Sequence, residues 1–489
     1  MIKNAGFKIS LLGFIIAPMF VATANAQRKP KAKLQTQKIK QSTNLSINDY
    51  MELAKQKNPL VKSYEIGQEG FASRVESAEI DLSPVVTGSY VNSTDQSKPS
   101  QLGTRRVAEI YTLGVAKKTI TGTTFKLDAQ TGKYVNDGVI FQGFDMYSTG
   151  AVNLTVQQSL WKDFFGHGTR NIIKRKTAQA QLEQLAFDLE ARATQIEIES
   201  TYWDYYLATE DLKLKKSNLE RAQKIDKWTS QRVSNGISDR SDLMNARALV
   251  ALRQVELLAA EEEFKNQEIK FKDNIGLAAN DTLPELNVNI ADSRPYIAEL
   301  MKHKNVIKID AKLKQVEAEL KAYVADEVTD QLRPDLNVFG TYSTTSYDRD
   351  HQQAVSDMTQ DGFLKNSFGV NFSWVFESDA KSSLRNSAQK EATAAKLKAE
   401  KKQLDGEKAW LEHVRKYELL KKSVTVLESV AQFQRERALA EQSKLSRGRT
   451  VTAQVVIAES DAAEAEINLL KTKTQLRKLE VASLLYINN

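Results

Sequence analysis

The sequence contains the same pattern twice, and this duplication constrains the fold more than any single residue does. Each half has a strand-rich block, a very long helical run, a reversal centred on glycine and a returning helix. The reversals lie at 234–237 and 447–449, and Gly448 follows Gly236 by 212 positions, an offset that the surrounding residues share. Self-similarity at a fixed spacing predicts two equivalent units, here 46–290 and 291–489.

The absence of helix-breaking residues predicts the long helices. Between 171 and 233 there is neither glycine nor proline, and between 379 and 446 only Gly406 interrupts. We therefore expect single helices over 165–233 and 379–446, each roughly 95 to 100 Å long.

Shorter helices complete each half. Returning helices are expected at 239–275 and 452–487, and helices at 46–82 and 295–330 come before the strands. End to end, two short helices match one long one, as a cylinder of uniform height requires. A single protomer offers too few strands and helices to close a barrel or a tube, so the pattern predicts a symmetric oligomer.

The first 26 residues resemble a secretory signal peptide. Lys3 and Lys8 precede an apolar stretch over 9–21, and Ala-Asn-Ala at 24–26 supplies small residues for cleavage. The alternative is a membrane anchor, for which the apolar stretch is short. The sequence predicts export, with a basic, flexible leader over 27–45.

Charge and cysteine content exclude several classes. Much of the formal charge of +7 lies in the signal peptide and the leader, so the rest of the chain is near neutral and nucleic acid is not an expected partner. The chain has no cysteine, which excludes disulfides and a lipid-modified cysteine.

Alternating side chains predict strands at about 85–160 and 335–376. The clearest strand carries Phe368, Val370, Phe372, Trp374 and Phe376 on one face, opposite a face that begins with Gly369 and Asn371. Such an apolar face is either buried in a sandwich core or exposed to lipid in a transmembrane barrel, with the other face lining a wet lumen. Because no second sheet of comparable size is expected, the face must meet either another subunit or lipid, and alternating segments of roughly ten residues with aromatic edges favour lipid.

Catalytic chemistry is not evident. The four histidines are scattered, and no zinc-protease, phosphate-loop, dinucleotide or nucleophile-elbow motif occurs. We expect no enzyme activity, no cofactor and no metal.

Several motifs together are similar to those of the TolC family of outer-membrane efflux proteins, over 46–487. They are Asn58-Pro59, the strand-to-helix junction at 157–166, and the turn at 234–238 with Asp242 and the Asn-Ala-Arg at 245–247.

The resemblance implies an α+β membrane protein in the outer membrane of a diderm bacterium. Three copies would form a β-barrel continued by an α-helical tunnel through the periplasm. The tunnel would dock with a periplasmic adaptor (membrane fusion protein) and an inner-membrane transporter, as in efflux or type I secretion, and conduct substrates passively. The tips implied to contact the adaptor are Ser234, Asn235, Gly236, Ile237, Arg447, Gly448 and Arg449.

The entrance departs from the family pattern. Gln454 and Ile457 stand where acidic residues are common, so a cation-binding ring is not expected there. Asp242 occupies a gating position, and we hypothesise that Arg447 or Arg449 pairs with it to hold the entrance closed. The alternative is an exposed arginine without a gating role.

Two further questions stay open at this stage. The first half has extra strand candidates at 111–117 and 123–134, which form an extracellular hairpin or widen the barrel. The rival function is a soluble periplasmic coiled-coil adaptor or spacer, in which the strands form a small domain.

Overall fold

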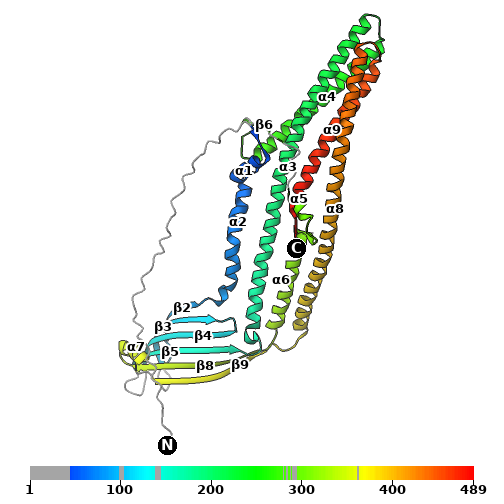
Figure 1. Cartoon of the computed structure of the whole chain (residues 1–489). Coiled ribbons are helices and arrows are strands. Elements are labelled where there is room, and N and C mark those ends of the chain that lie inside the picture. Colours follow the sequence, from blue (N-terminus) through cyan, green and yellow to red (C-terminus); the bar gives the residue numbers. More distant parts are fainter. Residues whose placement is uncertain are drawn as a thin grey trace. The chain divides into compact units, whose positions relative to one another are not determined.

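The computed structural model describes residues 44–98, 104–137, 145–278, 295–360 and 363–488, with single positions between 280 and 288. The predicted signal peptide lies outside the described residues, as does almost all of the predicted leader. From residue 44 onward, the chain forms one unit in which long helices run side by side and lead into one antiparallel sheet (Figure 1).

The two longest helices have equal lengths. α3 (His167–Ser234) and α8 (Asp379–Ser446) each contain 68 residues, and both of their ends are 212 positions apart. Each is followed, after a short turn, by a returning helix, α4 (Arg240–Asn274) or α9 (Thr452–Ala482). These bounds lie within two residues of the expected ones, except that α9 was expected to reach residue 487. It ends earlier because the chain passes through a 3-10 turn, η3 (Ser483–Leu485), into strand β10 (Tyr486–Asn488).

The single helix predicted over 46–82 is wrong. The segment forms α1 (Ile47–Lys57), α2 (Pro59–Glu76) and a 3-10 helix, η1 (Ser77–Leu82). Pro59 disfavours helical geometry at the preceding residue, and Asn58 is extended with ψ 119. The Asn58 side chain accepts hydrogen bonds from the first turn of α2, so the break also starts a new helix.

The helix predicted over 295–330 is also interrupted. The chain forms α5 (Pro295–Leu300), strand β7 (Val306–Lys308) and α6 (Ile309–Gln331). β7 pairs antiparallel with β10, which lies near the end of the chain. This pairing depends on residues about 180 positions away, so it cannot be predicted from local helix propensity. A second small sheet pairs β1 (Asn44–Leu45) with β6 (Glu285–Leu286).

The large sheet has six strands in the order β2-β3-β4-β5-β8-β9, all antiparallel. The extra strand candidates of the first half are full members of it. Among the described residues, β2 and β9 each pair on one side only, so the sheet of one protomer is open and no closed barrel is present. The strands are β2 (Val85–Thr94), β3 (Thr104–Lys118), β4 (Thr123–Asp137), β5 (Met146–Ser159), β8 (Asp335–Asp348) and β9 (Phe363–Ser373).

One prediction about the second strand block needs correction. β9 ends at Ser373, so Trp374 and Phe376 lie beyond it. β9 ends there because its neighbour β8 begins only after Pro334, and proline has no N–H to continue the hydrogen-bond ladder. Between β8 and β9 the chain forms a helix, α7 (His351–Gln360), which packs on β5 and β8.

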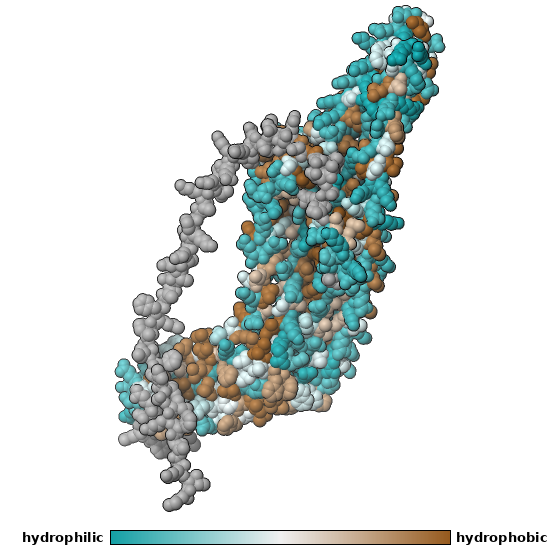
Figure 2. All heavy atoms as spheres, viewed as in Figure 1, coloured by the Kyte–Doolittle hydropathy of each residue, from teal (hydrophilic) through white to brown (hydrophobic). Residues whose placement is uncertain are grey.

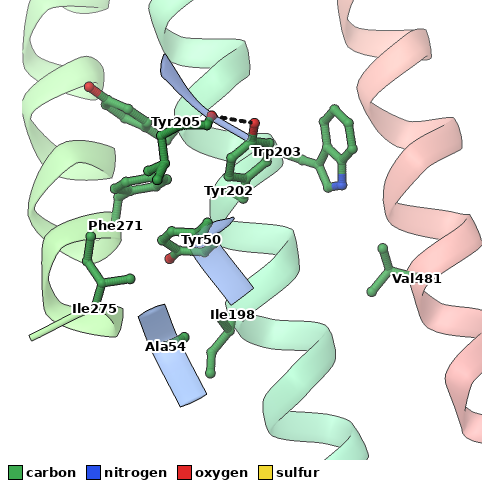
Figure 3. Packing of buried hydrophobic residues seen from close by; sticks show 10 residues of the cluster. Tyr50, Ala54, Ile198, Tyr202, Trp203, Tyr205, Phe271, Ile275 and Val481 are labelled. Carbon is green, nitrogen blue, oxygen red and sulfur yellow. Dashed lines mark hydrogen bonds between the residues drawn. The ribbon is translucent and has the colours of Figure 1, made fainter. Parts of the chain in front are cut away.

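Aromatic side chains fill the core where the short helices meet the long ones. Tyr50 of α1 stacks on Phe271 of α4 with ring centroids 4.3 Å apart, and it lies 5.5 Å from Tyr202 of α3. Figure 3 shows this cluster, with α1 lying between α3 and α4. Since buried aromatic pairs contribute about 0.5–1.5 kcal/mol beyond their area, the cluster anchors α1 to the helix pair.

A corresponding cluster in the second half contains a buried histidine. His413 of α8 lies between Trp410 and Tyr486, with ring centroids 5.9 and 4.9 Å away. Its Nε2 has no hydrogen-bond partner. Burial lowers the pKa of His413 from 6.5 to about 4, partly offset by a backbone hydrogen bond at Leu479.

This buried histidine predicts an acid-sensitive stability. The unfolded chain binds the proton more tightly than the folded chain, so the stabilisation is complete above pH 6.5 and is lost as the pH falls toward 4. The loss over this window is roughly 3 kcal/mol at most. The midpoint temperature of thermal unfolding of the detergent-purified protein should therefore fall as the pH drops below 6.5. In His413→Phe, the midpoint temperature should depend less on pH over this range. Identical profiles for both proteins would contradict this account.

Candidate membrane-inserted sheet and helical tips

One face of the sheet is apolar, and all six strands contribute exposed side chains to it, although α7 covers part of β5 and β8 near Gly150 and Thr344. The strand register places Val115, Leu127 and Leu154 side by side in one row, and the next rows follow the same alternation. Phe368 of β9 is 89% exposed, although it is one of the largest apolar side chains in the strand. We call this surface the apolar face. Its exposed members are Val86, Tyr90, Tyr111, Leu113, Val115, Phe125, Leu127, Leu154, Val156, Tyr342, Leu364, Phe368, Val370 and Phe372.

The opposite face is polar in its central rows. Thr155 and Thr341 lie hydroxyl to hydroxyl at 3.1 Å, in the same row as Lys126 and Ser367. In the next row Asn153 donates to Asp128 at 2.8 Å. These side chains satisfy one another or remain available to water. The sheet is thus polar on one side, in its central rows, and apolar on the other.

The structure shows no second sheet to cover the apolar face. In the described part of the chain, each of the other two sheets has two strands. Figure 2 shows apolar residues gathered over the strands, whereas the helices are more mixed. A contiguous apolar surface of this extent marks a contact with lipid or with another chain. Separately, no helix among the described residues is both long and apolar enough to cross a membrane.

The junction between sheet and helices depends on Asp163. Its carboxylate accepts from the backbone N–H of Thr169 at 2.7 Å and from the Thr169 hydroxyl at 2.6 Å, which caps the start of α3. The same carboxylate pairs with Lys118 at the end of β3 at 2.8 Å. The Asp163 N–H donates to Asp330 near the end of α6 at 3.0 Å. One residue therefore connects a strand and two helices.

Electrostatics at this junction favour a charged Asp163. Burial acts to raise the pKa of Asp163, but Lys118 and the hydrogen bonds from Thr169 outweigh it and hold the pKa below its usual value. Asp163 and Phe165 both have positive φ, 55° and 44°, a conformation that sequence patterns do not reveal for these residue types. Sequence analysis missed this network.

Exposed aromatic side chains gather at the same end of the sheet. Aromatic rings of this kind are typical of the boundary between the hydrocarbon layer and water. Trp374 lies over the buried Lys381 ammonium, which is 5.4 Å from the ring centroid and donates to the Val375 carbonyl at 3.1 Å. The exposed aromatic residues are Trp161, Phe164, Phe165, Trp374 and Phe376.

The two helical tips have the same backbone geometry. Gly236 and Gly448 have φ of 72° and 76°, a left-handed conformation that favours glycine. After each glycine, the next N–H donates to a carbonyl five residues back at 2.8 Å, from Ile237 to Arg232 and from Arg449 to Lys444. This is the Schellman closure of a helix end.

The structure brings the tips together and leaves the predicted contact residues exposed. Arg232 donates to the Leu445 carbonyl at 3.2 Å, which links the two turns. The buried hydroxyls of Thr229 and Thr452 lie 3.2 Å apart just below. The exposed tip residues are Ser234, Asn235, Gly236, Ile237, Arg447, Gly448 and Arg449.

The predicted entrance residues lie at the start of the returning helices. Asp242 accepts a hydrogen bond from Ser238 at 2.5 Å. In the described part of the chain, no ion pair joins Asp242 to Arg447 or Arg449. Gln454 and Ile457 are exposed on α9.

A buried charge network below the tips was not predicted. Glu459 of α9 is 5% exposed and pairs with Arg221 of α3 at 2.9 Å and with Arg435 of α8 at 3.5 Å. Gln442 of α8 also donates to it. Because a buried carboxylate left without its cations is costly, this network holds three helices together.

The described residues contain no group of three or more histidine, aspartate or glutamate side chains placed to hold a metal ion.

Comparison with known proteins places the fold. No family model matches the sequence, and no curated protein matches it. Solved structures match over 90% of the chain. VceC from Vibrio cholerae is 15% identical, with 95% of its chain covered and a TM-score of 0.60. The outer-membrane channel OprN is 16% identical (89% covered, TM-score 0.60), and CmeC from Campylobacter jejuni is 14% identical (85% covered, TM-score 0.57). The chain has the fold of the TolC-family outer-membrane channels.

The two faces of β9 allow a matched test of lipid contact. Val370 belongs to the apolar face, and Asn371 points to the other side of the same strand. Val370→Lys should abolish membrane assembly, because a lysine facing the middle of a bilayer costs about 2–4 kcal/mol. Asn371→Lys should assemble normally. The measurement is the amount of each variant in purified outer membranes. Equal amounts would contradict lipid contact of the apolar face.

Proposed function

We propose that this protein is an outer-membrane channel that carries exported molecules through the periplasm and out of the cell. The observation that carries this proposal is the exposed apolar face on a sheet whose other face is polar. Lipid on one side and water on the other satisfy both faces at once. The helices extend the same wall: α3 alone is about 100 Å long at ~1.5 Å per residue.

The fold supports the same class of function. The solved structures with this fold include proteins described as outer-membrane channels. We infer an outer-membrane location and a tunnel in the periplasm on this basis. The protein would act without chemical change to its cargo, as a duct and not as an enzyme.

Three copies would complete the duct. One protomer supplies an open sheet and an open row of helices, so neither a barrel nor a tube closes within one chain. We infer a homotrimer from this and from the fold. The equal lengths of α3 and α8 and their matching tip turns support an internal duplication, which gives the ring six similar tips.

The exposed tips are the proposed docking site for a periplasmic adaptor, which would connect the duct to an inner-membrane transporter. Ile237 is 63% exposed at the first tip, and Arg447 and Arg449 are exposed at the second. An exposed apolar side chain on one tip and exposed arginines on the other suit a protein partner.

Channel recording tests the function directly. The detergent-purified protein should run as a trimer and give discrete openings in a planar bilayer. A soluble species that needs no detergent and gives no conductance would contradict the channel. It would support the rival assignment, a soluble periplasmic adaptor or spacer.

The same recording addresses the entrance. We propose that Asp242 of one copy pairs with Arg447 or Arg449 of the next and stabilises the closed state. Asp242→Ala should then raise the conductance or the open fraction, whereas Gln454→Ala, on the equivalent turn of α9, should not. Unchanged recordings for Asp242→Ala would exclude this pairing as a gate.

A further inference from the structure

The β3–β4 hairpin is part of the sheet wall along its whole length. β3 pairs with β2 from Ala116 opposite Val85 to Val107 opposite Thr94. β4 pairs with β5 from Thr123 to Val135. A hairpin that stood outside the barrel would leave β2 paired with β5, and the structure has two strands between them.

The hairpin has the same two faces as its neighbours. Leu113 and Leu127 belong to the apolar face and are 62% and 51% exposed. Lys126 and Asp128 point to the polar face, where they pair at 3.3 Å. An extracellular hairpin, with water on both sides, has no need for this alternation. The pattern indicates that lipid and lumen flank β3 and β4 as they flank the other strands.

The two open edges lack the usual protection against pairing. Soluble proteins place charges, prolines or bulges on exposed edge strands. β2 has ten residues, none of them charged or proline, and β9 has Lys365 as its one charged residue. In lipid, the unpaired N–H and C=O groups of these edges require partners. The edges are therefore suited to pairing with another strand.

We propose that three copies close into an eighteen-stranded barrel, in which β9 of each copy pairs with β2 of the next. Three six-stranded sheets supply the eighteen strands. β2 and β9 run in opposite directions within one sheet, so this junction is antiparallel like all the others. The inference rests on the trimeric channel proposed above and adds the hairpin to its wall. The occupant of each open edge is a second copy of this chain.

In the same proposed trimer, the width of the helical part also favours eighteen strands. α2, α3, α6 and α8 pack side by side in one row, so three copies give twelve helices around the tunnel (Figure 1). Twelve helices about 10 Å apart make a ring with a circumference of about 120 Å.

Eighteen strands match this ring. At about 4.8 Å spacing and about 40° tilt, they make a circumference of about 113 Å, whereas twelve strands make about 75 Å. The barrel and the tunnel then join without a constriction at the Asp163 junction.

Electron cryomicroscopy of the detergent-purified, full-length protein counts the strands directly. A ring of three copies with eighteen strands in cross section is the expected result. A ring of three with twelve strands, and the hairpin outside it, would overturn this inference and leave the channel intact. The absence of any ring would overturn both.

Engineered cysteines can show in native membranes whether the hairpin lies inside or outside the barrel wall. The chain has no cysteine of its own, so no other thiol interferes. Gly88 of β2 has open space around it and lies opposite Leu113 of β3. Gly88→Cys should form a disulfide with Leu113→Cys. The control partner is Val152→Cys on β5, in the same row but beyond β4, and it should not crosslink. A crosslink to position 152 and none to position 113 would place the hairpin outside the wall.

Discussion

Backbone groups at the edge of a sheet must find hydrogen-bond partners, and in lipid they cannot find them in water. This constraint governs the protein. The apolar face has too much exposed hydrocarbon for water, and lipid covers it only if the sheet has no open edge. Closure by copies of the same chain satisfies both requirements. The proposed oligomer, its wet lumen and its continuous wall all follow from the alternation of side chains along six strands.

The junction around Asp163 transfers this arrangement to the helices. A strand end, the start of α3 and the end of α6 meet at Asp163, so the direction of the sheet sets the direction of the long helices. At the far end, the network around Glu459 joins α3, α8 and α9 beneath the tips. Local polar networks thus fix each end of helices whose length comes from sequences without breakers.

Much of this fold can be predicted from sequence, for identifiable reasons. The ends of α3 and α8 follow from glycine and proline placement, and the two faces of β9 follow from alternation. What sequence patterns miss depends on distant partners. β7 is a strand because β10 pairs with it, and α7 is a helix where it packs on β5 and β8. The break at Pro59 is an exception, because a proline in the sequence itself indicates where a helix is interrupted.

The residues of the candidate site also fall into those that sequence patterns reveal and those that they do not. The glycines of the tips and the apolar residues of β9 are visible as motifs. Asp163 and Glu459 are not, because each acts through residues far away in the sequence, such as Lys118 or Arg221. Nor does a sequence show how many strands the wall has, because that count depends on which strands pair.

The most direct test of the central claim is the environment of each side chain along β9. Single cysteines at positions 364 to 373, each carrying a nitroxide spin label, can be compared in reconstituted membranes for collision with oxygen, which enriches in lipid, and with a water-soluble nickel chelate. The account predicts strict alternation: oxygen access peaks at the even positions from 364 to 372, and nickel access peaks at the odd positions from 365 to 373. Uniformly low oxygen access on the apolar face would show that protein, and not lipid, covers it.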